Sequence, residues 1–183
     1  RGETLAQTYS VVPDQLTQLN IVIESDKNLL HLEESKRLTA LPGNGPKIAF
    51  LDIQLSVGRS EWTVLYESAI PGDEVACFGV VNAKALVEPR PCSIANFRLQ
   101  YGVCMYVART GSIWQNGIRS HETVAKAHKG DRITMIINHR EGTVVLYINN
   151  LYQGAIFRGI TEPVFPAFVF ENGSVSASES ETI

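Results

Sequence analysis

The residues that could perform acid–base chemistry are few and scattered along the chain. The closest pair of carboxylates, Glu24 and Asp26, flanks Ser25 in a polar stretch. A glycosidase needs two carboxyl groups placed about 5–9.5 Å apart across the bond that it cleaves. This pair has no third carboxylate nearby and lies at a predicted turn. We therefore interpret it as a solvated hairpin end and not as a catalytic site.

Metal ligands and nucleophiles also lack the spacing that their chemistry requires. Zinc sites use closely spaced Cys or His pairs, and no such pair occurs among the histidines and cysteines, which are His31, His121, His128, His139, Cys77, Cys92 and Cys104. The sequence contains no glycine-rich phosphate loop, no serine nucleophile elbow and no Cys–His pairing. We therefore predict that the chain is not an enzyme and that it uses no metal and no cofactor.

Composition and charge exclude several classes of partner. The 183 residues are 44% hydrophobic and 19% charged, with a formal net charge of −3, so no electrostatic attraction to nucleic acid or anionic lipid is expected. No apolar run approaches the ~20 residues of a membrane span. Cys77 and Cys104 lie in apolar runs and are predicted to be buried thiols, which favours a reducing compartment, the cytoplasm or the nucleus. The sequon at Asn172 argues weakly against this, and whether it is used stays open.

Short β-strands are the elements that must position any site. Runs rich in Val, Ile, Tyr and Phe are separated by Gly, Pro and Asn turns, and no helical periodicity of useful length is present. The predicted strands are 20–24, 29–33, 47–57, 61–67, 75–81, 97–108, 133–137, 143–148, 152–157 and 164–169, with a hairpin at 113–117. This pattern predicts an all-β chain folded as an antiparallel two-sheet β-sandwich.

One stretch, 129–169, carries the ordered residues of a known family. It contains a Gly-Asp turn before a hydrophobic strand, a glycine turn, a strand that ends in aromatic-x-Asn, and a Phe-Pro-Ala strand. The matching residues are Gly130, Asp131, Gly142, Thr143, Tyr147, Asn149, Gly154, Phe157, Phe165, Pro166 and Ala167. With Phe78-Gly79-Val80-Val81 and the Trp114–Gly117 hairpin, the chain resembles a SPRY domain over about 19–177. At the end of the first strand of this stretch, Asn138-His139 stands where the family often has an acidic residue.

The resemblance implies a concanavalin-like jelly roll with a lead-in at 1–18, a SPRY-like domain at 19–177 and a tail at 178–183. SPRY domains usually recognise peptide or protein epitopes through loops at one edge, and many are the substrate-reading part of large ubiquitin ligases or scaffolds. By similarity, and because Arg and Tyr are common interface residues, the predicted partner-binding residues are Glu34, Arg90, Arg98, Tyr101, Phe170, Glu171 and Asn172. Arg90 lies between two prolines, which stiffen its loop. Because the chain begins at Arg1, we expect it to be part of a larger polypeptide, monomeric in isolation.

The alternative is a lectin-like glycan-binding module on the same sandwich. Such lectins commonly use a calcium loop or an exposed aromatic platform, and the only acidic loop near glycine, 72–74, is too poor in oxygen ligands for calcium. We expect Trp62 to be a core residue, and Trp114 and Tyr101 could be core as well. Phe165 is predicted to lie between the sheets. If the loop residues do not bind a partner, the outer sheet face with Val145 and Tyr147 is the next candidate.

Overall fold

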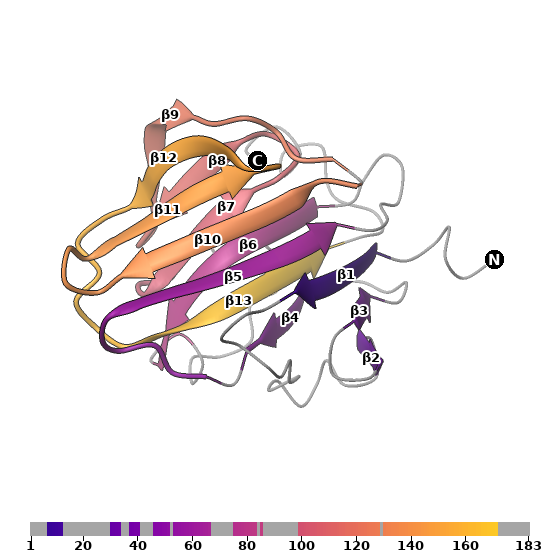
Figure 1. The fold of residues 1–183 in the computed structure, drawn as a ribbon, viewed down its shortest axis with the longest axis horizontal. Helices are drawn as coiled ribbons and strands as arrows, with labels where there is room; N and C mark the ends of the chain where they lie inside the picture. The colour runs from indigo at the N-terminus through magenta and orange to yellow at the C-terminus, as the bar shows by residue number, and fades with distance from the viewer. Residues whose placement is uncertain are drawn as a thin grey trace.

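The chain folds as a β-sandwich, which confirms the predicted fold class. The computed structural model describes residues 7–12, 30–33, 37–40, 46–51, 53–66, 75–83, 85, 99–128 and 130–171. Within these ranges, thirteen strands form two antiparallel sheets that face each other (Figure 1). None of the described residues belongs to a helix with the length and apolarity needed to cross a bilayer.

The first sheet has seven strands. They are β1 (Gln7–Val12), β2 (Leu30–Glu33), β3 (Arg37–Ala40), β5 (Arg59–Tyr66), β10 (Arg132–Asn138), β11 (Thr143–Ile148) and β12 (Leu151–Phe157), in the order β12-β11-β10-β5-β1-β3-β2. Side chains alternate in β5: Trp62, Val64 and Tyr66 are buried against the other sheet, and the residues between them are only partly buried. This alternation is the expected pattern for a strand with one face in the core, and Trp62 is a core residue as predicted.

The second sheet has six strands. They are β4 (Pro46–Phe50), β6 (Val75–Asn82), β7 (Val103–Val107), β8 (Ser112–Gln115), β9 (Ile118–Thr123) and β13 (Val164–Glu171), in the order β4-β13-β6-β7-β8-β9. Alternate residues of β6 join different clusters: Phe78 and Val80 lie in the core between the sheets, and Cys77 and Val81 lie in a second buried cluster. Burial on both faces explains why β6 and β13 are almost continuously apolar.

The structure corrects several predicted boundaries. Gln7–Val12, predicted to be part of a lead-in, form β1, which pairs with both β3 and β5 inside the seven-stranded sheet. The strand predicted at 47–57 ends at Phe50, apart from an isolated bridge at Leu55. The strand predicted at 97–108 begins only at Val103, after a turn. The strand predicted at 20–24 lies outside the described residues.

Phe165 does not lie between the sheets, so that prediction is wrong. In β13, Val164, Phe168 and Phe170 join the core between the sheets, whereas Phe165 is only partly buried and packs against the second cluster. Pro166 has no amide hydrogen and therefore omits one ladder bond. Its carbonyl accepts a hydrogen bond from the Leu51 amide (2.9 Å), so its nitrogen, which carries no hydrogen, faces the segment that follows β4.

The polar residues of the family-like motif connect the start of β10 to the end of β11. Asp131 accepts hydrogen bonds from the backbone amide of His128 (2.7 Å) and from the side-chain amide of Asn149 (2.8 Å). Asn149 in turn accepts one from the amide of Arg132 (2.8 Å). Its φ of 50° is in the left-handed region, which Asn tolerates better than most residues. The Gly-Asp turn and the aromatic-x-Asn strand end therefore close one end of the β10–β11 hairpin.

Candidate functional site

Loops that are distant in sequence meet at the end of the sandwich where β13 begins. We call this surface the Tyr101 loop end and define it by Asn82, 99–102, 116–117 and 158–163. Val164, at the start of β13, pairs with Asn82, at the end of β6. The Asn82 amide donates to the carbonyl oxygen of Gly102 (2.9 Å), which brings Tyr101 to the same end.

Asn82 bonds through its buried side chain to the 158–163 loop and to the turn that follows β6. Its Nδ2 donates to Oε2 of Glu162 (2.8 Å), and its Oδ1 accepts from the amide of Ala85 (3.1 Å). The Gly102 amide donates to Oδ1 of Asn116 (2.7 Å), which connects the turn between β8 and β9. Because these bonds join residues from separate loops, the loop end is held in one arrangement before any partner arrives, which lowers the ordering cost of binding.

Gly102 is required by this arrangement. Its φ is +83°, and a Cβ atom at this position would lie 2.2 Å from Oδ1 of Asn82. Any other residue would strain the backbone and displace the side chain that organises the loops.

Apolar side chains are exposed on the hydrogen-bonded loops of the Tyr101 loop end. Tyr101 is 61% exposed and Leu99 is 58% exposed, so Tyr101 is not a core residue. A cavity of about 40 Å³ lies beside Tyr101, far smaller than the ~300–1,000 Å³ typical of small-molecule sites. A tyrosine on a rigid, open surface is instead typical of contacts with proteins.

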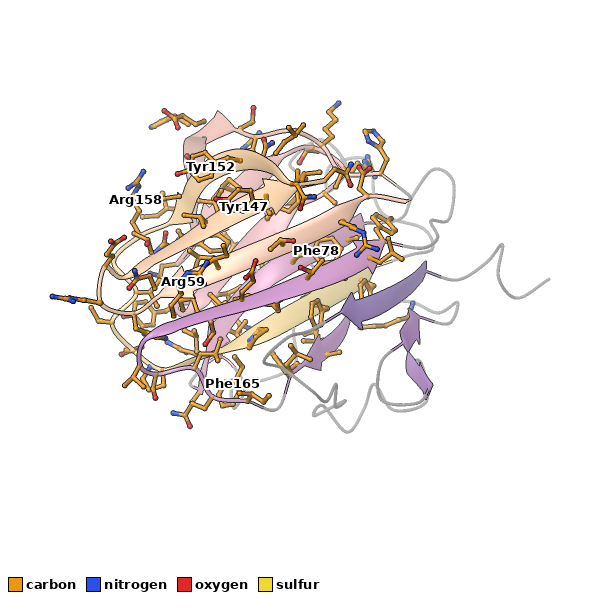
Figure 2. All side chains as sticks on the ribbon, in the orientation of Figure 1. Arg59, Phe78, Tyr147, Tyr152, Arg158 and Phe165 are labelled. Carbon is orange, nitrogen blue, oxygen red and sulfur yellow. The ribbon has the colours of Figure 1, made fainter. Side chains whose placement is uncertain are left out.

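Hydrogen bonds at the Tyr101 loop end also join the two sheets. The side chain of Gln115, at the end of β8, donates to the backbone carbonyl of Arg158 (2.5 Å) and accepts from its amide (3.2 Å). The exposed Arg158 side chain projects from the same end (Figure 2), and none of the described residues pairs with its guanidinium. Arg158 therefore offers a charged contact at this end of the sandwich that we did not predict from the sequence.

The predicted binding residues do not share one surface. Phe170 is fully buried between the sheets, so a direct contact role for its ring is wrong. Glu171 ends β13 opposite Val75, whereas Tyr101 lies near Val164. Seven residue steps along a strand span roughly 23 Å, so Glu171 and Tyr101 lie at opposite ends of the sandwich. The other predicted residues, Glu34, Arg90, Arg98 and Asn172, lie outside the described residues.

Sequence reasoning missed Leu99, Asn82 and Glu162. Leu99 could have been found, because an apolar residue between polar residues just before a glycine turn has no evident place in the core. The contact between Asn82 and Glu162 joins residues 80 positions apart. No local pattern predicts such a contact.

The described residues offer little reactive chemistry. Cys77 and Cys104 are buried and form no disulfide with a described residue, and burial raises the pKa of the Cys104 thiol to about 12, which keeps it in its unreactive neutral form. Among the described residues, no three His, Cys, Asp or Glu side chains lie close enough together to hold a metal ion. Cys92 lies outside the described residues.

Comparisons with known proteins agree with this geometry. The family model described as SPRY domain matches residues 63–180. Among solved structures, the chain is similar to the SPRY domain of human HERC1 (TM-score 0.66, 20% identity, 78% of this chain and 86% of that chain). It is also similar to the TRIM65 PSpry domain (0.59, 14%, 87% and 90%) and to a human SPRY domain (0.53, 15%, 80% and 98%). No curated protein sequence matches significantly. Because the family model covers well over half of the sequence, the chain belongs to the SPRY domain family.

Proposed function

We propose that this SPRY domain recognises a short peptide or protein epitope through the Tyr101 loop end. SPRY domains are generally protein-interaction modules. The observation that carries the proposal is that Tyr101 and Leu99 are exposed on loops held together by Asn82 and Asn116. Exposed apolar side chains on a pre-organised frame bind at a low entropic cost. As in many members of this family, the bound epitope would be the substrate of a ubiquitin ligase or the client of a scaffold.

The test is a selection of phage-displayed random peptides against the 183-residue chain, followed by titration of a selected peptide against variants. Tyr101→Ala should weaken binding by ~1–3 kcal/mol, because a central interface tyrosine commonly contributes this much. The melting temperature should hardly change, because the ring is mostly exposed. Arg158→Ala should also weaken binding, by a smaller amount.

Tyr152→Ala is the matched control. Tyr152 is 62% exposed, almost the same as Tyr101, but it lies on β12 and not in the loop before β7. If Tyr152→Ala weakens binding while Tyr101→Ala does not, the Tyr101 loop end is not the site. Arg90→Ala, Arg98→Ala and Glu34→Ala test the remaining loop residues. Glu171→Ala tests the opposite end, and Asn172→Ala tests the next residue in the sequence. A loss confined to Glu171→Ala would move the site to the opposite end.

A further inference from the structure

A groove crosses the outer face of the seven-stranded sheet, away from the Tyr101 loop end. Its volume is about 300 Å³, and its lining residues are Glu61, Thr63, Thr134, Ile136, Tyr147 and Asn150. The strand register explains how they meet: Thr63 of β5 pairs with Thr134 of β10, and Thr134 pairs with Tyr147 of β11. The two threonine hydroxyls are hydrogen-bonded at 2.8 Å. One wall of the groove is therefore aromatic, and its middle carries hydroxyl oxygens.

The aromatic wall is the ring of Tyr147, which contacts a second tyrosine just outside the groove lining. Tyr147 pairs across the strands with Tyr152 of β12, and their ring centroids are 5.4 Å apart with the planes tilted by 59° (Figure 2). Two rings at this tilt do not form the continuous flat platform on which a sugar ring would stack. The negative faces of such rings do attract a compact positive charge.

The opposite wall carries a carboxylate. Glu61 is partly exposed, and none of the described residues forms a hydrogen bond or an ion pair with its side chain. Arg59 lies two residues earlier on the same face of β5, but no ion pair joins the two side chains. No lysine or arginine lines the groove. The carboxylate, the two rings and the hydroxyl oxygens all favour a positively charged occupant.

We infer that this groove accepts a lysine or arginine side chain from an extended segment of a protein partner, with its charge between Glu61 and the Tyr147 ring, which Tyr152 supports from outside the groove. This contact is separate from the epitope bound at the Tyr101 loop end. It would add a requirement for a basic residue to whatever partner the domain binds.

The experiment is an NMR titration of the isotope-labelled chain with a short peptide that carries one lysine between glycines. The amide signals of Thr63 and Thr134 should shift. The same peptide with norleucine in place of lysine should cause no shift there, because norleucine keeps the four-carbon chain of lysine but lacks its ammonium group. Glu61→Gln should weaken lysine-peptide binding about two- to fivefold, and Tyr152→Ala should weaken it about as much. Arg59→Ala should strengthen binding, because it removes a nearby positive charge.

Tyr101→Ala is the control and should leave this binding unchanged. The backbone spectrum of each variant shows whether it is folded. The inference is overturned if the norleucine peptide shifts the same signals equally, if Glu61→Gln has no effect, or if the signals that shift lie elsewhere. It is also overturned if a neutral oligosaccharide shifts Thr63 and Thr134 and the lysine peptide does not, because that result would identify the groove as a glycan site.

Discussion

Two phenylalanines of β13 provide a direct test of how this strand faces the core. Phe168 is 2% exposed and lies between the sheets, where its ring packs edge-on against Phe78 at a centroid distance of 6.4 Å. Phe165 lies three residues earlier, is only partly buried and packs on the other side of the same sheet. We expect Phe168→Ala to lower the free energy of unfolding by ~3–5 kcal/mol. The loss of the edge-on ring contact should place it near the top of that range.

Phe165→Ala should cost roughly 1–2 kcal/mol, because only part of its ring leaves water on folding. Urea unfolding followed by the fluorescence of buried Trp62 measures both values. With a slope of ~2 kcal/mol/M, the midpoint should fall by ~1.5–2.5 M for Phe168→Ala and by less than ~1 M for Phe165→Ala. If Phe168→Ala does not fold, Phe168→Leu and Phe165→Leu give the same comparison. Equal losses at the two positions would refute the assignment of faces in β13.

Three further predictions concern the core and the cysteines. Gly79→Ala should cost more than ~3 kcal/mol or prevent folding, because its Cβ would lie 1.8 Å from the carbonyl oxygen of Cys104; an unchanged circular-dichroism melt would contradict this. The raised pKa of Cys104 stabilises the folded chain below pH 9, and this stability should be lost as the pH rises towards about 12, because only the unfolded thiol ionises in that window. Urea unfolding of Cys104→Val at increasing pH should show a smaller loss of stability than the parent chain. An identical loss in the two proteins would argue against this role of Cys104. Calorimetry should show one unfolding transition that is unaffected by a chelator, and two transitions or a chelator-dependent shift would count against a single metal-free domain.

Local chemistry accounts for the strands that the sequence predicts well. The bounds of β11, Thr143–Ile148, are those expected from its alternation and from the glycine turn before it. β1 was missed because its place is set by partners far along the chain: it lies between β3 and β5, and its own sequence, QTYSVV, has little apolar alternation. A strand of this kind is specified by pairing more than by its own propensity.

The face that each residue of β13 presents could not be read from the sequence, for a different physical reason. A one-residue change of register moves every side chain to the other face, and a strand with one polar face reveals its register through alternation. Both faces of β13 are apolar because both are buried. Phe165 was assigned to the wrong face for this reason. Phe170 was missed for another reason: the strand was predicted to end at residue 169, whereas β13 continues to Glu171 and buries the Phe170 ring between the sheets. Tyr101, in a loop, was not subject to this ambiguity.

Tyr101 and Tyr152 also allow the two proposed surfaces to be separated in one experiment. The two side chains have nearly equal exposure, and one lies in the loop before β7 whereas the other lies on β12, so the effects of removing them should add within ~0.3–0.5 kcal/mol. A peptide that occupies only the loop end should respond to Tyr101→Ala alone, and the lysine peptide should respond to Tyr152→Ala alone. For a protein partner that covers both surfaces, the binding free energy lost in the double variant should equal the sum of the losses in Tyr101→Ala and Tyr152→Ala. A loss that departs from the sum by more than ~1 kcal/mol would mean that the two tyrosines act through one continuous site, and the division of this domain into a loop end and a sheet-face groove would then be wrong.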